Sequence, residues 1–206
     1  MIDDPDWAGR YSDEAVSEST QRTVRALGRV LAARHSYLGQ HGAAVARRTL
    51  ELCDALGYFE QERPWLAISG RLHDIGTIAI TDLVILKPGS LSAGETEIIR
   101  CHPVVGYHIL GELAVPGSVC ETVLYHHERL DGSGYPQGLI GDEIPLAARV
   151  LAVADVFEAM TAERPWRKAL PIQQVFSELR HMAGSVLDAT VVEALLAEAD
   201  SKPEEK

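Results

Sequence analysis

The chain has 206 residues, of which 46% are hydrophobic and 24% are charged, and its formal net charge is −11. This composition predicts one globular domain with short appendages. No apolar run is long enough to cross a bilayer, and the acidic N-terminus is unlike a signal peptide. We therefore expect a cytoplasmic protein with no membrane partner. The acidic excess argues against a DNA partner, since binding to DNA depends on clustered Lys and Arg.

The two ends of the chain show little periodicity of apolar residues. A helical pattern appears after the N-terminal segment. Residues 1–22 are acidic, and we interpret them as an arm or the remnant of a linker. Residues 23–200 are expected to form the domain and residues 201–206 a disordered tail. Apolar or small residues from position 45 to 56 share one helix face that stops at Gly57, and His41 lies at the entry to that helix.

The middle of the chain predicts two helices that end at histidines. Residues 64–72 are largely apolar and lead into His73 and Asp74, where Gly76 soon breaks the pattern. After a turn at residues 87–89, a capping box at Ser92-Ala-Gly-Glu95 predicts the start of a helix. We expect that helix to end at His102, because Pro103 follows it.

The last third of the chain predicts a loop and then further helices. Residues 131–145 are rich in glycine and should form a long ordered loop, after which a strong helix carries Asp155 among apolar residues. Residues 172–182 repeat the helical period, and Thr190 with Glu193 predicts a capping box for the last helix. No alternating strand pattern occurs, so the predicted fold is all-α.

Imidazoles and carboxylates recur at the predicted helix ends and breaks. Neutral imidazole nitrogen together with carboxylate oxygen binds divalent iron, manganese or zinc, and sites of this mixture without cysteine tend to be catalytic. The candidate ligands are His41, His73, Asp74, His102, His126, His127 and Asp155.

Each candidate taken alone has a plainer interpretation. A His-Asp pair is often incidental, His102 before a proline suits a helix cap, and the two histidines before Glu128 suit a solvated turn. Asp155 is harder to explain, because a carboxylate in an apolar helix is costly unless it is paired or bound to a metal. Its alternative is a structural ion pair with an arginine.

Three cysteines, Cys53, Cys101 and Cys120, are widely separated and form no Cys-x-x-Cys motif. They predict neither a disulfide framework nor a zinc knuckle. We expect all three to act as small apolar residues in the packing.

The order and spacing of the candidates resemble the HD-GYP family, a branch of the HD-domain phosphohydrolases, over roughly residues 34–197. Leu-His-Asp-Ile-Gly at 72–76 resembles the defining motif of the family, followed by Lys-Pro-Gly at 87–89 and His-Pro at 102–103. His-His-Glu-Arg-Leu-Asp-Gly-Ser-Gly-Tyr-Pro at 126–136 is close to a complete family signature, and residues 149–155 and 164–167 resemble the closing one. The resemblance implies an HD-domain helical bundle with a long glycine-rich GYP loop.

The resemblance also implies a metal-dependent phosphodiesterase that hydrolyses cyclic di-GMP to linear pGpG and GMP. Two divalent ions would be held by the seven candidates, with iron or manganese favoured over zinc, nickel or magnesium. His73 and Asp74 would be catalytic, and Asp74 would be shared by the two ions. The implied substrate contacts are Arg164, Arg167, Tyr135, Thr77 and Lys87. The implied partners are a sensory or response-regulator domain, a GGDEF-type protein, or a second copy in a homodimer.

Two positions depart from the family pattern. The family usually has a lysine after His-Asp-x-Gly to help hold a phosphate, but here the residue is Thr77. This departure leaves open a catalytically weak sensor or adaptor that binds cyclic di-GMP, or a phosphohydrolase acting on another nucleotide. Some members carry a glutamate for a third metal where this chain has Tyr37, so we expect two metals. The histidines that match no ligand position, and are expected in capping or surface roles, are His35, His108 and His181.

Overall fold

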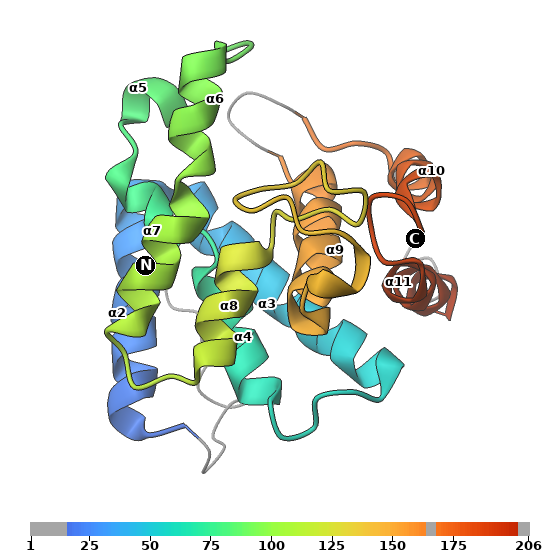
Figure 1. The fold of residues 1–206 in the computed structure, drawn as a ribbon, viewed down its shortest axis with the longest axis horizontal. Helices are drawn as coiled ribbons and strands as arrows, with labels where there is room; N and C mark the ends of the chain where they lie inside the picture. Colours follow the sequence, from blue (N-terminus) through green and yellow to red (C-terminus); the bar gives the residue numbers. More distant parts are fainter. Residues whose placement is uncertain (1–15, 164–167, 202–206) are drawn as a thin grey trace.

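The computed structural model describes residues 16–163 and 168–201, and every regular element in these ranges is helical (Figure 1). The only β-structure among the described residues consists of isolated β-bridges, which confirms the predicted all-α fold. The elements in chain order are α2 (Glu18–Arg34), α3 (Ser36–Leu56), α4 (Arg63–Leu72), the 3-10 turn η1 (Ile75–Ala79), α5 (Asp82–Ile85), α6 (Ala93–Arg100), α7 (His102–Gly111), α8 (Gly117–Tyr125), η2 (Gly141–Glu143), α9 (Leu146–Thr161), α10 (Ile172–Met182) and α11 (Ala189–Ser201).

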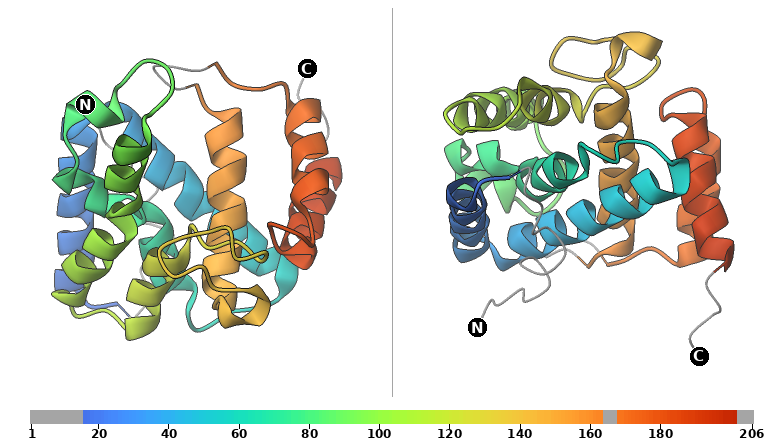
Figure 2. Two further views of the ribbon diagram at one scale, coloured as in Figure 1. Left: turned by 45° about the horizontal axis from the view of Figure 1, so that its top comes forward. Right: turned by 90° about the horizontal axis from the view of Figure 1, so that it is seen from below.

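Helix α3 runs from the side of α2 toward the C-terminal helices, as the right-hand view in Figure 2 shows. It contacts α2, α4, α9 and α11. One apolar core is built mainly from α3, α9, α10 and α11, and a second one from α2, α3, α4, α7 and α8. The helices of both cores carry candidate ligands or lead directly into them. The packing of these helices against one another therefore positions the ligands.

Helices α3 and α4 approach each other closely at Gly70. A Cβ atom at this position would lie 2.7 Å from the Cα atom of Ala46 on α3, closer than real side chains allow. The glycine therefore lets α4 bring His73 toward His41 of α3, and the centroids of these two imidazole rings lie 5.2 Å apart.

The first described helix begins earlier than the sequence pattern indicates. Helix α2 begins at Glu18 rather than Thr23, and the Ser17 hydroxyl caps it by accepting a hydrogen bond from the Thr20 N–H at 3.2 Å. Residues 18–22, which the sequence assigns to the arm, are therefore helical, and the rest of the predicted arm lies mostly outside the described residues.

His102 begins a helix instead of ending one, so that expectation is wrong. Helix α6 ends at Arg100, and α7 starts with His102 and Pro103. Proline is well tolerated there, because the first N–H groups of a helix have no intrahelical partner. The break between the two helices falls at Cys101.

The N-terminal cap of α11 is Asp188, so the predicted capping box of Thr190 and Glu193 is wrong. The Oδ1 atom of Asp188 accepts hydrogen bonds from the N–H groups of Thr190 at 3.0 Å and Val191 at 3.3 Å. Thr190 already lies in the first turn. The helix ends at Ser201, and the remainder of the predicted tail lies outside the described residues.

Replacing Asp188 with Ala should lower the free energy of unfolding by about 1 to 2 kcal/mol, because the cap and the 2.9 Å ion pair with Arg149 are both lost. Thermal and urea unfolding followed by circular dichroism measure this change. Glu193→Ala, at an exposed position in the same helix, is the control and should cost less than about 0.5 kcal/mol. Equal losses in the two variants would contradict the assignment of the cap.

Residues 131–145 form the predicted ordered loop, interrupted only by η2. The loop passes over the ends of α8 and α9 in Figure 1. It is therefore held next to the elements that carry His126, His127 and Asp155.

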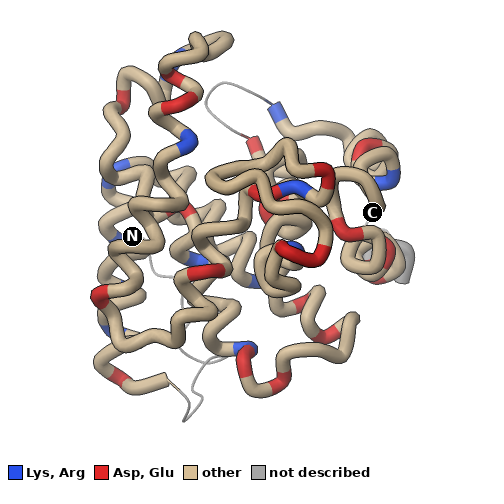
Figure 3. Tube along the Cα trace, viewed as in Figure 1, with Lys and Arg blue, Asp and Glu red and all other residues tan. Residues whose placement is uncertain are grey.

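No helix among the described residues has both the length and the apolar character that a membrane span requires. Figure 3 shows Asp and Glu distributed over N-terminal, central and C-terminal helices alike. Acidic residues are thus not confined to one end of the described chain.

Candidate metal centre

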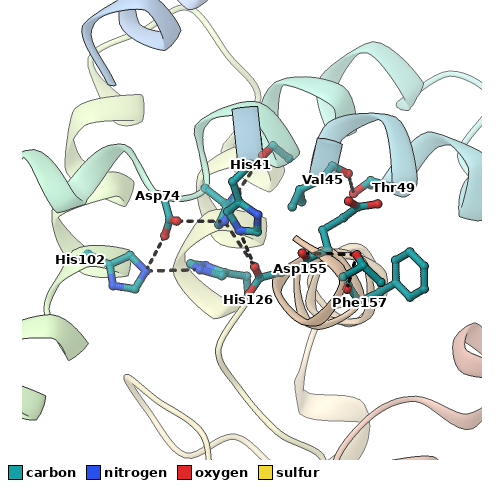
Figure 4. Close-up of polar contacts among 12 residues, drawn as sticks. His41, Val45, Thr49, Asp74, His102, His126, Asp155 and Phe157 are labelled. Atoms are coloured by element: carbon teal, nitrogen blue, oxygen red, sulfur yellow. Dashed lines mark hydrogen bonds and ion pairs between the residues drawn. The ribbon is translucent and has the colours of Figure 1, made fainter. Parts of the chain in front are cut away.

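The structure brings together all seven candidate ligands. Figure 4 labels five of them, which are His41, Asp74, His102, His126 and Asp155. His41 comes from α3, His102 from the start of α7 and Asp155 from α9, while the other four directly follow α4 and α8. The ligand atoms fall into two groups, each with its atoms within 4.8 Å of one another. The first group is His41, His73 and Asp155, and the second is Asp74, His102, His126 and His127.

Asp74 lies between the two groups and faces both. Its Oδ2 atom is 3.4 Å from Nε2 of His73, and its Oδ1 atom is 3.3 Å from Nε2 of His102. A carboxylate placed in this way can offer one oxygen to each of two ions. Asp74 is therefore placed where it could be shared if each group held an ion.

The same kind of backbone hydrogen bond orients three of the histidines. Nδ1 of His73 lies 2.8 Å from the carbonyl oxygen of Gly70, and Nδ1 of His102 and of His126 contact the carbonyl oxygen three residues earlier at 2.8 and 2.6 Å. A carbonyl oxygen only accepts, so each Nδ1 carries the proton and each Nε2 is left toward the centre. Such backbone contacts fix the tautomer that a metal-binding histidine needs.

Gly76 allows Asp74 to lie so close to His102. A Cβ atom at position 76 would overlap the carbonyl oxygen of His102 and would lie 2.7 Å from the backbone nitrogen of Gly106. The turn after His73 and Asp74 therefore packs backbone to backbone against the first turns of α7. Only glycine permits this approach without moving one segment.

The carboxylates perturb the protonation of the first group. Burial pushes the pKa of His73 down, but the carboxylates of Asp74 and Asp155 outweigh it and raise the pKa of His73 to about 9. Burial acts to raise the pKa of Asp155, yet its hydrogen bond with His41, at 2.9 Å, and the charge of His73 hold that pKa well below its usual range. The partners of Asp155 are thus the site histidines, which argues against the arginine ion pair considered as its alternative.

The second group contains neutral imidazoles beside an ionised carboxylate. Burial and the charges of neighbouring histidines lower the pKa of His126 to about 3 and that of His127 well below its usual range. Burial acts to raise the pKa of Asp74, but the surrounding histidines hold it well below its usual range. Two neutral nitrogens and a carboxylate are ready to bind a cation without first losing a proton.

The residues present fit a divalent metal. Nε2 of His73 is buried without a hydrogen-bond partner, and the nearest carboxylate oxygens lie at 3.4 and 3.7 Å. A buried nitrogen without a partner is costly unless an ion occupies the space in front of it. The donor set of imidazole nitrogen and carboxylate oxygen is one that iron, manganese and zinc accept.

Comparison with known proteins gives the family. A family model described as "HD domain" matches residues 25–191. The chain is 41% identical over 149 residues, 70% of its own length, to "Cyclic di-GMP phosphodiesterase response regulator RpfG" of Xanthomonas campestris. The chain belongs to the HD-GYP branch of the HD-domain family.

Two further similarities agree with this family. The HD-GYP chain is 33% identical over 182 residues, 88% of its length, to "3'3'-cGAMP-specific phosphodiesterase 3" of Vibrio cholerae. It spans only 39% and 40% of these two relatives. An HDG"Y"P protein from Bdellovibrio bacteriovorus matches 95% of this chain and 68% of its own with a TM-score of 0.69 at 15% identity, which shows a shared fold.

The GYP loop packs directly onto a ligand of the centre. The ring of Tyr135 lies 4.7 Å, centroid to centroid, from the ring of His127, and the Tyr135 N–H donates to the His127 carbonyl oxygen at 3.2 Å. Burial and the nearby Asp74 carboxylate raise the pKa of Tyr135, so its phenol stays neutral. Tyr135 therefore lies beside the centre, where the resemblance expects a substrate contact.

Glu128 organises this loop, a role that the sequence reasoning missed. It is 2% exposed, and its carboxylate accepts hydrogen bonds from three consecutive backbone N–H groups at 2.7, 3.1 and 3.0 Å. Those N–H groups belong to residues 137–139 of the GYP loop. The residue after His127 therefore holds the loop against the ligand turn, and the solvated turn considered for Glu128 does not form.

Replacing Glu128 with Ala should leave those three N–H groups without their acceptor and loosen the loop. We expect amide hydrogen exchange at residues 137–139 to become at least about tenfold faster, since each lost charge-assisted hydrogen bond is worth on the order of 1.5 kcal/mol or more. Exchange measured by mass spectrometry tests this. Glu143→Ala removes an exposed carboxylate of the same loop that accepts one N–H from Ile140, and it should change these amides far less. Unchanged exchange in Glu128→Ala would contradict the role.

The remaining expected substrate contacts lie in different settings. The hydroxyl of Thr77 donates to the carbonyl oxygen of Asp74 at 2.7 Å, so it stabilises the turn that carries Asp74. The Nζ atom of Lys87 is engaged by both oxygens of Glu95 at 2.8 and 2.7 Å. Arg164 and Arg167 lie outside the described residues.

The histidines without an expected ligand role lie away from the two ligand groups. His108 and His181 are exposed, in agreement with surface roles. His35 lies 3.0 Å from the Asp82 carboxylate. Tyr37 stacks near His35 at 5.8 Å between centroids, and its phenol offers no carboxylate for a third metal.

The expected packing role of the cysteines is correct for two of the three. Cys53 and Cys120 are buried, whereas Cys101 is exposed, so the expectation for Cys101 is wrong. The physical reason is its place in the break between α6 and α7, where His102 turns inward and its neighbour turns outward.

Proposed function

We propose that this HD-GYP domain hydrolyses cyclic di-GMP through linear pGpG to GMP, using two divalent ions held by the seven ligands. The observation that carries the proposal is the convergence of these side chains from five helical segments, with Asp74 facing both groups. The relatives named as cyclic di-GMP and 3'3'-cGAMP phosphodiesterases support a cyclic dinucleotide as the substrate class.

The side chains and backbone of the protein would hold the ions and orient the histidines that bind them. When bound, the ions would activate water and offset negative charge on the phosphate. Asp74 would hold an ion with each oxygen, and the backbone carbonyls behind His73, His102 and His126 keep their Nε2 atoms aimed inward. Because the carboxylates of Asp74 and Asp155 raise the pKa of His73, this residue would have to give up a proton at neutral pH in order to hold an ion.

The donor chemistry guides the choice of metal. Iron or manganese suits a mixture of imidazole and carboxylate without thiolate, and zinc, nickel or magnesium are the alternatives. We propose iron or manganese as the working metal.

The preferred cyclic dinucleotide is the finer part of the proposal. The chain resembles relatives named for cyclic di-GMP and relatives named for 3'3'-cGAMP, at 41% and 33% identity in the two cases compared above. We favour cyclic di-GMP because of the higher of these two identities.

A second candidate function is a sensor or adaptor that binds cyclic di-GMP with little turnover. Thr77 motivates it, because its hydroxyl is used by the Asp74 carbonyl and carries no charge for a phosphate. In this reading the domain would signal through a sensory or response-regulator domain, a GGDEF-type protein or a second copy of the chain.

A turnover assay with defined metals tests the proposal. Protein reconstituted without oxygen with iron or manganese is given cyclic di-GMP, 3'3'-cGAMP and linear pGpG, and the products are separated by chromatography. We expect GMP from cyclic di-GMP, with pGpG appearing first. A preparation carrying His73→Ala with Asp74→Ala is the control for contaminating hydrolases.

The outcomes separate the alternatives. Tight binding of cyclic di-GMP by calorimetry without product would favour the sensor, and restored turnover in Thr77→Lys would support it further. Faster hydrolysis of 3'3'-cGAMP would replace the proposed substrate. Full turnover by the control variant would overturn the proposed site.

A further inference from the structure

We propose that Arg100 contacts a phosphate oxygen of the cyclic dinucleotide and thereby sets substrate affinity. This inference rests on the proposed function and adds to it a residue outside the ligand set. It starts from the position of Arg100 at the end of α6, two residues before the ligand His102.

The guanidinium of Arg100 lies at the edge of the metal centre. Its Cζ atom is 5.3 Å from the centroid of the Tyr135 ring, within the range of a cation–π contact. The Tyr135 ring in turn lies 4.7 Å from the ring of His127 and 6.4 Å from that of His102. Only one aromatic ring therefore separates this cation from two ligands.

The partners of Arg100 leave it able to bind an anion. Its ion pair with Glu97, at 3.3 Å, joins side chains that are 45% and 71% exposed, and such pairs contribute little. A guanidinium that stacks on an aromatic face keeps its N–H edge available for a planar, two-point contact with a phosphate. Tyr135 thus holds the cation in place without using its hydrogen-bond donors.

Two other cations, Lys87 and Arg129, are already engaged. Lys87 donates to both oxygens of Glu95, and Arg129 donates to the carbonyl oxygens of His126 and Glu128 at 3.1 and 2.8 Å. A cyclic dinucleotide brings two negative phosphates toward a centre that contains two carboxylates, in a chain of net charge −11. Attraction must therefore come from a few placed cations and the metal ions.

Steady-state kinetics on the metal-loaded protein tests this role, with Arg100→Gln, Arg100→Lys and Arg180→Gln compared with the wild type. Arg180→Gln is the matched control, because Arg180 is also exposed and its loss changes the net charge equally, but it lies on α10, across α9 from α6 in Figure 1. We expect Arg100→Gln to raise KM for cyclic di-GMP by about tenfold or more with little change in kcat, since the contact is made in both ground and transition states. Arg100→Lys should recover part of the loss, and Arg180→Gln should behave like the wild type.

A second substrate distinguishes a phosphate contact from a contact to the base. Bis(4-nitrophenyl) phosphate is a phosphodiester without guanine, and Arg100→Gln should weaken its use as well. A defect confined to cyclic di-GMP would overturn the phosphate assignment. Metal content, measured in parallel, should be the same in all variants, and a loss of metal in Arg100→Gln would show a structural role instead.

Failure of this inference is distinguishable from failure of the proposed function. If the wild type turns over cyclic di-GMP and Arg100→Gln keeps the same KM within about twofold, only the role of Arg100 is refuted. If the wild type binds without turnover, the dissociation constant for cyclic di-GMP replaces KM in the same comparison. A wild type that neither binds nor hydrolyses cyclic di-GMP would refute both.

Discussion

Protein in which Asp74 is replaced with Asn should no longer retain metal after reconstitution. Its turnover of cyclic di-GMP should fall by on the order of 1000-fold or more. Asn keeps the shape of the side chain but loses the charge and one of the two carboxylate oxygens. Because those oxygens face His73 at 3.4 Å and His102 at 3.3 Å, the change affects both ligand groups at once. Metal analysis and initial rates measure the two effects.

The metal-free variant gives an independent readout. The carboxylates hold the pKa of His73 at about 9 against the effect of burial, so losing the charge of Asp74 should lower that pKa. Titration of the imidazole followed by NMR measures the shift. Asp82→Asn is the matched control, since this exposed carboxylate also pairs with a histidine, His35, at 3.0 Å. Retained metal and turnover in Asp74→Asn would contradict the shared-ligand geometry.

Replacing Gly76 with Ala should disable the centre without replacing any of the seven candidate ligands. The added methyl group would overlap the His102 carbonyl oxygen, so the turn that carries Asp74 must move away from α7. Overpacking of this kind costs about 1 to 3 kcal/mol of stability. We also expect metal affinity to fall at least about tenfold, because supporting changes around metal ligands commonly cost 10- to 100-fold.

Gly94→Ala is the control for this substitution. Gly94 lies within α6, and a Cβ atom there would meet nothing within 4 Å. Alanine should therefore be neutral or slightly stabilising at that position. Thermal unfolding and metal titration compare the two variants. Equal metal affinity in Gly76→Ala and the wild type would show that the close approach to α7 does not position the ligands.

Part of the candidate ligand set could be predicted from residues that stand at breaks in helical patterns or inside an apolar one, although His41 lies within α3 and at no break. His73 and Asp74 follow an apolar run that stops at a glycine, and Asp155 interrupts an apolar helix where an unpaired carboxylate would be costly. The family resemblance supplied the order of the seven positions. The structure adds what spacing alone does not contain, which is the division into two groups with Asp74 between them.

Other features depend on contacts between distant segments and were not predictable. Pro103 was interpreted as a stop signal, but proline also suits the first turn of a helix, so His102 begins α7. Asp188 caps α11 because the chain turns there, while the Thr190 and Glu193 spacing imitates a capping box.

Glu128 could have been suspected from its place between the ligand His127 and a glycine-rich loop. Such a loop has many N–H groups that need an acceptor, and a carboxylate at its start can supply one. Its burial and its three bonds nevertheless depend on how the loop folds back over the turn. The sequence alone does not contain that path.

Elemental analysis of protein purified without oxygen in the presence of iron or manganese tests the dinuclear centre most directly. The geometry predicts about two ions per chain in the wild type and neither ion in the variant that combines His73→Ala with Asp74→Ala. A folded wild type that retains no ion, or a double variant that retains both, would contradict the assignment of these seven side chains as one metal centre.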